Sequence, residues 1–150
     1  MPLIQMSLVE GLAPLSHPPS TRAPRFLVAE NNRHLRFVLT YLLGKSFPGA
    51  RIVTGANGEE ALAEFDRHGA DMVISERAMP VMDGPALVRQ LRTRSCALPI
   101  LLISDGQEAC DEDMANGACS FLTKLEIPTR FTAEVGRLLG GSNHPHAKLF

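Results

Sequence analysis

The sequence has too few cysteines for a disulfide framework. It contains 3 in 150 residues, Cys96, Cys110 and Cys119. The number is odd and no C-x-x-C spacing occurs, so neither a disulfide scaffold nor a zinc site is indicated. We therefore expect reduced, buried or half-buried thiols in a protein of the cytoplasm.

An excess of one charge and long apolar runs are also missing. The 15 basic residues stand against 16 acidic ones, and without a basic excess a nucleic-acid partner is not expected. No run approaches the roughly 20 apolar residues of a membrane span. The N-terminus carries Glu10 but no basic segment ahead of its apolar residues, so a signal peptide is not expected either. The 45% of hydrophobic residues does suffice for a globular core.

Proline marks the two ends of the chain. Of the 11 prolines, 6 lie outside residues 25–140, and residues 1–24 are rich in Pro, Ser and Thr in their second half. We predict a flexible N-terminal arm over residues 1–24, one domain over residues 25–140 and a C-terminal tail over residues 141–150. Whether the arm binds a partner is left open.

Five short apolar runs alternate with helical patterns between these ends. Runs without polar alternation are typical of strands that are buried on both faces of a parallel sheet. They cover residues 26–29, 52–54, 72–74, 100–103 and 121–123. The segments between them repeat apolar residues at helical spacing, and the first such stripe consists of Leu35, Val38, Leu39 and Leu42. The prediction is an α/β protein of the doubly wound (βα)5 type, with a central five-stranded parallel sheet.

A sheet of this kind binds ligands beyond the carboxyl ends of its strands. Polar residues follow four of the predicted strands: Glu30, Asn31 and Asn32, then Ser75, Glu76 and Arg77, then Ser104 and Asp105, and finally Lys124. Their oxygen atoms could bind a divalent cation. The same side chains could equally form a self-neutralised lysine–glutamate network. The residues alone leave both interpretations open.

Several ordered motifs resemble the receiver domain of two-component response regulators. The sequence MVISERAMPVMDG at residues 72–84 looks like the family's third strand, phosphorylation loop and M-P-x-M-D-G turn. FLVAENN at 26–32 resembles the first strand with its acidic pocket, GEEAL at 58–62 the start of the second helix, and FLTK at 121–124 the fifth strand. The resemblance implies the flavodoxin-like receiver fold, with sheet order 2-1-3-4-5.

The resemblance also assigns positions in a phosphorylation site. A histidine kinase would transfer a phosphoryl group to an aspartate that ends the third strand, and this chain has Glu76 there. The acidic pocket that would hold Mg²⁺ corresponds to Glu30, Asn31, Glu76 and Ala78, with Asn31 in place of an acid. The switch and pocket positions correspond to Ser104, Asp105, Phe121 and Lys124, where Asp105 replaces a small residue and Leu125 replaces the proline after the lysine.

Three of these departures disfavour phosphorylation. Glu76 is longer than aspartate, and a misplacement of ~1 Å can cost on the order of 100-fold in rate. Asn31 removes an anionic ligand from a cation that requires near-octahedral oxygen geometry. Asp105 adds negative charge at the entrance of the pocket. Glu76 could instead pair with Lys124 or Ser104, either imitating the phosphoryl charge or forming a fixed structural ion pair.

The sequence therefore predicts an atypical receiver, or pseudo-receiver, that is not an enzyme and acts as a protein–protein interaction module in a two-component-type pathway. The expected partner is a histidine kinase or a downstream signalling protein, and homodimerisation is left open. No cofactor is expected, although weak Mg²⁺ binding could remain. The alternative is an active phosphoacceptor that uses Glu76 or a nearby carboxylate with Mg²⁺. A stand-alone receiver is expected, because few residues follow residue 140.

The region after the fourth strand has an unusual length and charge. Gly117 lies only 13 positions after Ser104, fewer than the resemblance to receiver domains implies, so we expect a short, irregular or shifted fourth helix. Residues 105–113 hold five acids and no base, and they could form a solvated acidic turn or a charged partner surface. We interpret Arg77 as a solvated charge or one at the rim of the pocket, and His34 and His68 as surface residues.

Overall fold

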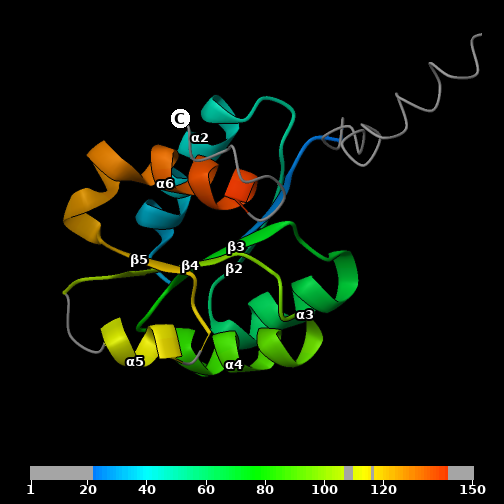
Figure 1. Cartoon of the computed structure of the whole chain (residues 1–150), viewed down its shortest axis with the longest axis vertical. Coiled ribbons are helices and arrows are strands. Elements are labelled where there is room, and N and C mark those ends of the chain that lie inside the picture. Colours follow the sequence, from blue (N-terminus) through cyan, green and yellow to red (C-terminus); the bar gives the residue numbers. More distant parts are fainter. Residues whose placement is uncertain (1–21, 107–109, 116, 142–150) are drawn as a thin grey trace, which may run out of the picture.

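A five-stranded parallel sheet forms the centre of the protein, with helices on both of its faces (Figure 1). The structure is a computed structural model, and it describes residues 22–106, 110–115 and 117–141. The sheet order β2-β1-β3-β4-β5 confirms the predicted doubly wound topology. In chain order, the strands are β1 (Arg25–Ala29), β2 (Arg51–Gly55), β3 (Met72–Glu76), β4 (Ile100–Ser104) and β5 (Ser120–Thr123).

The helices divide between the two faces of the sheet. α2 (Arg33–Ser46) and α6 (Ile127–Gly141) cover one face, and α3 (Gly58–His68), α4 (Gly84–Arg94) and α5 (Cys110–Ala115) cover the other (Figure 1). A short 3-10 turn, η1 (Lys124–Glu126), connects β5 to α6. None of the described helices is long and apolar enough to cross a bilayer.

The strand patterns follow from this layering. Every residue of β3 and β4 is buried, which explains why both strands are continuous apolar runs ending in polar residues. Alternate residues of β1 enter opposite cores: Phe26 and Val28 pack on the α2 and α6 side, whereas Leu27 packs on the α3 and α4 side. β2 is an edge strand and exposes Arg51 and Thr54.

Side chains cap α3 and α4 at the carboxyl edge of the sheet, as Asn32 does for α2. Asn57 Oδ1 accepts a hydrogen bond from the backbone N–H of Glu60 at 2.8 Å, and Asp83 Oδ1 accepts one from the N–H of Ala86 at 3.0 Å. Gly84 follows Asp83, and a Cβ at position 84 would lie 2.5 Å from the carbonyl oxygen of Glu76. The loop after β3 can therefore close tightly over the end of that strand only with glycine at this position.

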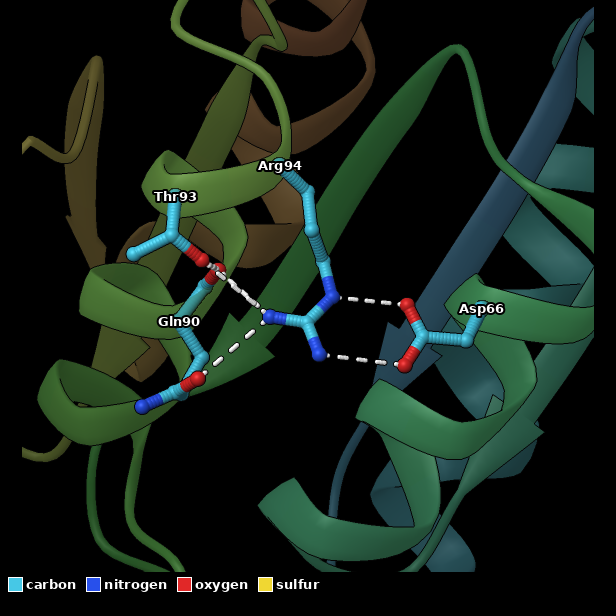
Figure 2. Close-up of polar contacts among 4 residues, drawn as sticks. All are labelled: Asp66, Gln90, Thr93 and Arg94. Carbon is cyan, nitrogen blue, oxygen red and sulfur yellow. Dashed lines mark hydrogen bonds and ion pairs between the residues drawn. The ribbon is translucent and has the colours of Figure 1, made fainter.

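An exposed ion pair connects α3 to α4 (Figure 2). Arg94 donates from Nε to Asp66 Oδ1 at 2.7 Å and from Nη2 to Oδ2 at 3.1 Å. Its remaining Nη1 donates to the backbone oxygen of Gln90 at 3.0 Å. The hydrogen bond from Arg94 lowers the pKa of Asp66 below its ordinary value. The two helices are thus linked at the end of the molecule away from the candidate site.

Two expectations about individual side chains are wrong. The predicted apolar stripe includes Val38, but this side chain is 41% exposed and Leu43 is buried instead. The buried side of α2 is centred between Leu39 and Leu43, which leaves Val38 at its border. Cys96 and Cys119 are exposed rather than buried or half-buried.

The predicted arm and tail fall mainly on residues 1–21 and 142–150, which lie outside the described residues. Within the predicted arm, Arg22 donates to Asp71 at 3.0 Å, and the carbonyl of Pro24 accepts from the N–H of Arg51 at 3.0 Å. The domain boundaries stay predictions.

Candidate functional site

The carboxyl ends of the strands bring three of the predicted site residues together. Glu30 follows β1, Glu76 is the last residue of β3, and Lys124 follows β5. The two glutamates are 0% and 3% exposed, respectively. Lys124 Nζ lies 2.8 Å from Glu76 Oε1. The sheet thus places an ammonium group directly against a buried carboxylate.

The second oxygen of Glu76 is also held. Glu76 Oε2 accepts a hydrogen bond from the backbone N–H of Ala78 at 2.9 Å. Ala78 contributes its main chain here, and its side chain is exposed. Oε2 thus has an N–H partner, whereas Oε1 has the charge of Lys124 beside it but no hydrogen bond of normal geometry among the described residues. The two contacts together offset part of the cost of removing the carboxylate from water.

Glu30 is less well satisfied. Its Oε2 accepts from the backbone N–H of Asn32 at 2.9 Å, whereas its Oε1 is buried without a hydrogen-bond partner among the described residues. Burial raises the pKa of Glu30 above its ordinary value, and the nearby charge of Glu76 adds to the increase. The Asn32 N–H and Lys124 oppose this increase without cancelling it.

Lys124 neutralises more than one acid. Its Nζ also lies 3.3 Å from Oδ1 of the exposed Asp105. Burial lowers the pKa of Lys124, but the hydrogen bond and charge of Glu76, together with Asp105 and Glu30, outweigh burial and raise the pKa overall. The ammonium group therefore stays charged, and the cluster forms the self-neutralised lysine–glutamate network that was one of the two sequence interpretations.

The two predicted switch residues lie near this network but are not hydrogen-bonded to Glu76 in the described structure. Ser104 is buried at the end of β4, and its Oγ accepts from the N–H of Gly106 at 3.3 Å. Phe121, in β5, packs against the core on the α3 and α4 side. Of the two partners that the sequence offered to Glu76, the structure thus joins it to Lys124.

The donors present do not fit a Mg²⁺ site. Within the described part of the chain, no group of three or more His, Cys, Asp or Glu side chains is arranged to hold a metal ion. Asn31 is exposed, and both oxygens of Glu76 already have partners, one of them the ammonium group of Lys124. A divalent cation would have to displace that ammonium group and find further oxygen ligands.

The structure also shows a buried ion pair that the sequence interpretation missed. Arg77, directly after Glu76, donates from Nε to Asp113 Oδ2 at 2.7 Å. Asp113 is 1% exposed, and its Oδ1 is buried without a partner among the described residues. The hydrogen bond with Asp113 is the main reason why the pKa of Arg77 is raised.

This pair corrects one expectation and narrows another. Asp113 does not belong to a solvated acidic turn, because its buried carboxylate and the Arg77 side chain join α5 to the loop after β3. Arg77 is paired and 29% exposed, which leaves only the interpretation of a charge at the rim of the pocket. The described residues of α5 are Cys110–Ala115. Residues 107–109 and 116 lie outside the described residues, so the short fourth helix stays a prediction. Glu108, another member of the acidic stretch, lies outside the described residues. His34 and His68 are exposed, as predicted.

Comparisons with known proteins agree with this architecture. Residues 26–135 match the response regulator receiver domain. A curated relative, the sensory transduction protein RegX3 of Mycobacterium bovis, is 36% identical over 115 residues, which are 75% of this chain and 49% of that protein. The chain thus spans about half the length of the curated relatives it matches.

Solved structures show the same fold. The signal receiver domain of a histidine kinase from Syntrophus aciditrophicus has a TM-score of 0.72 and 28% identity, over 81% of this chain and 93% of that one. The chemotaxis response regulator CheY4 of Vibrio cholerae has a TM-score of 0.70 and 26% identity, over 77% of this chain and 98% of that one.

Proposed function

Because the chain belongs to the response regulator receiver family of two-component signal transduction, we propose that it is a pseudo-receiver. Receiver domains interact with histidine kinases in two-component systems. In this proposal the chain is a protein–protein interaction module that is not an enzyme and is not switched by phosphorylation in the usual way. Its partner is a histidine kinase or a downstream signalling protein. The mycobacterial relative, named as a sensory transduction protein, supports a signalling role. The cytoplasmic location stays a prediction.

The ion pair between Lys124 and Glu76 carries the proposal. Glu76 stands at the end of β3, where the family resemblance places the phosphoacceptor, and its Oε1 lies 2.8 Å from Lys124 Nζ. An attacking carboxylate needs a free oxygen at a defined distance from the phosphodonor. Here both oxygens have partners and the side chain is one methylene longer than aspartate. The carboxylate would have to leave these partners before it could attack.

Two neighbouring residues support the same conclusion. Phosphoryl transfer depends on a cation and on positive groups that neutralise the developing charge. Asn31 supplies no carboxylate, and Asp105 lies on the exposed side of Lys124, where it would repel an approaching phosphodonor. With a poor cation site and an added acid, phosphorylation has little electrostatic support.

The proposal can be tested by the intact mass of the full chain after incubation with Mg²⁺ and a small acyl phosphate. A conventional receiver serves as the positive control, and Glu76→Gln is the matched variant. We expect a phosphoryl mass shift in the control receiver and none in this chain. A shift in the wild type that is lost in Glu76→Gln would instead establish the alternative, an active phosphoacceptor.

The role of Glu76 in an unphosphorylated receiver can be tested separately. A single carboxylate carries less charge than the roughly −2 of a phosphoryl group, yet its contact with Lys124 is one that such a group could make. If Glu76 imitates the phosphoryl charge, Glu76→Gln weakens binding of the kinase or downstream partner. Unchanged binding would identify the ion pair with Lys124 as structural.

A further inference from the structure

The outward side of α2 carries a cluster of exposed apolar side chains. Phe37, Val38 and Tyr41 are 69%, 41% and 55% exposed, and they make up half of the six exposed large hydrophobic residues in the described part of the chain. The rings of Phe37 and Tyr41 stack, with centroids 6.4 Å apart and planes at 21°. Single exposed apolar residues are ordinary, but a contiguous group marks an interaction site.

No described segment covers these rings. α2 buries Leu39 and Leu43 on its other side, towards the sheet and α6. The contact between α2 and α6 includes Ser46 and Thr132, whose hydroxyl oxygens are 3.4 Å apart. The stacked rings of Phe37 and Tyr41 therefore do not contribute to the hydrophobic core. α2 packs on the sheet and on α6 without them.

The charge of α2 has one sign. The helix contains Arg33, Arg36 and Lys45 and no acidic residue. Arg36 donates to the backbone oxygen of Glu30 at 2.6 Å, and Lys45 Nζ lies 6.0 Å from the centre of the Tyr41 ring. None of the ion pairs among the described residues involves α2, although the whole chain has a net charge of −1. Arg36 faces the carboxylate of Glu30, whereas the positive charges of Arg33 and Lys45 have no ion-pair partner among the described residues.

A shallow groove lies between α2 and the edge strand β2. Its volume is about 300 Å³, and it is lined by Arg33, Arg36, Phe37, Thr40 and Thr54. The lining combines an aromatic ring, two hydroxyl groups and two guanidinium groups, and it includes no carboxylate. Such a groove suits one apolar side chain flanked by negative charge.

We propose that the α2 surface, defined as Arg33, Phe37, Val38, Tyr41 and Lys45, binds an acidic segment of another protein that also carries an aromatic or leucine side chain. The inference rests on the proposed role as an interaction module and names the chemistry of the partner. The apolar side chain would occupy the groove beside Phe37, while carboxylates would pair with Arg33 and Lys45. Aromatic residues and arginine supply most of the energy at such interfaces.

The test is a selection from a random peptide display library on the immobilised full chain. The double variant Arg33→Glu/Tyr41→Ser is used for counter-selection. We expect enriched peptides with net negative charge and an aromatic or leucine residue. Their affinity should fall at least about tenfold in Tyr41→Ser and in Arg33→Glu, and it should weaken as salt is added.

Two matched variants control for non-specific effects. Leu125→Ser removes an exposed apolar side chain elsewhere, and Arg89→Glu reverses an exposed charge on α4. Both should change the affinity by less than about twofold, because surface substitutions away from a contact have small effects. Thermal unfolding of each variant should show that the fold is kept.

Other outcomes would overturn the proposal. Enriched peptides that are neutral or basic, or that bind the double variant equally well, would contradict it. Self-association that Tyr41→Ser abolishes would identify a second copy as the occupant. The two proposals can fail separately, because Glu76 is not part of the α2 surface. A phosphoryl mass shift after incubation with the acyl phosphate would contradict the pseudo-receiver proposal without changing the result of the peptide selection.

Discussion

At the scale of single residues, Lys124 controls the stability of the pocket. Its ammonium group lies against the buried Glu76, and its (CH₂)₄ stem is partly buried. Lys124→Met keeps most of that stem but leaves Glu76 without its counter-charge. We expect the free energy of unfolding to fall by about 2–3 kcal/mol at neutral pH, since a buried charge loses its partner while part of the site stays wet. Urea denaturation of the wild type and of Lys124→Met measures this difference in the free energy of unfolding.

The raised pKa of Lys124 predicts how the stability lost in Lys124→Met depends on pH. The pKa of Lys124 is raised above 10.5, so its stabilisation is present below that value and is lost only as the pH rises through the higher folded pKa. The difference between wild type and Lys124→Met should therefore stay constant from pH 7 to about pH 10. Lys45→Met, at an exposed position, is the control and should change little.

Glu30 should destabilise the folded state at neutral pH, unlike an acid whose pKa is lowered by folding. Burial raises its pKa above 4.5, so its contribution to stability is present below that value and is lost as the pH rises through the folded pKa. Glu30→Gln keeps an oxygen for the N–H of Asn32 and removes the charge. We expect its melting temperature to exceed that of the wild type at neutral pH and to converge with it near pH 4. Equal differences at both pH values would contradict the prediction.

At the scale of elements, Arg77 holds α5 in place. The described part of α5 is too short to be stable alone, and Arg77 binds its buried Asp113 at 2.7 Å. Arg77→Met should leave Asp113 buried and unpaired. We expect the amide hydrogens of α5 to lose at least about tenfold of their exchange protection, with a smaller loss in β3 and β4.

The control for this effect is an exposed ion pair. Arg94→Met removes the link between α3 and α4 that Figure 2 shows, where both charged groups face solvent. Its effect on exchange should be small and should disappear as salt is added. If α5 keeps its protection in Arg77→Met, the pair with Asp113 does not hold the helix.

The elements also show what the sequence could and could not predict. The strands β3 and β4 were predictable because burial on both faces produces unbroken apolar runs. The caps Asn57 and Asp83 were predictable because they act within three residues. The pair of Arg77 and Asp113 was not, since it joins residues 36 positions apart and has no local period. Tertiary packing alone decides that this acid is buried while the neighbouring Glu112 is exposed.

At the scale of the whole molecule, the sheet order explains why the candidate site could be found from the sequence. β1 and β3 are neighbours, so Glu30 and Glu76 must lie side by side at the carboxyl edge. β4 separates β3 from β5, and Lys124 has to reach across the end of β4 to meet Glu76. A lysine is long enough to do so. The topology therefore predicted which residues meet, and the side-chain geometry selected the lysine–glutamate network.

The contacts of Glu76 also predict how Mg²⁺ affects the stability of the folded protein. A ligand that binds only the folded state stabilises it by mass action, so affinity can be measured as a shift in melting temperature. We expect no saturable shift in the wild type with up to about 10 mM Mg²⁺, because Lys124 and Ala78 hold both oxygens of Glu76 and Asn31 offers no charge.

The matched variant carries Asn31→Asp, Glu76→Asp and Asp105→Ala together. It shortens the central carboxylate, adds an anionic ligand and removes the exposed acid, while the fold stays the same. At a Mg²⁺ concentration about ten times its Kd, the melting temperature of this variant should rise by roughly 3–6 °C. A saturable rise in the wild type would show that Glu30 and Glu76 still bind a cation. A rise confined to the triple variant would mean that these three side chains, and not the receiver fold, keep Mg²⁺ out.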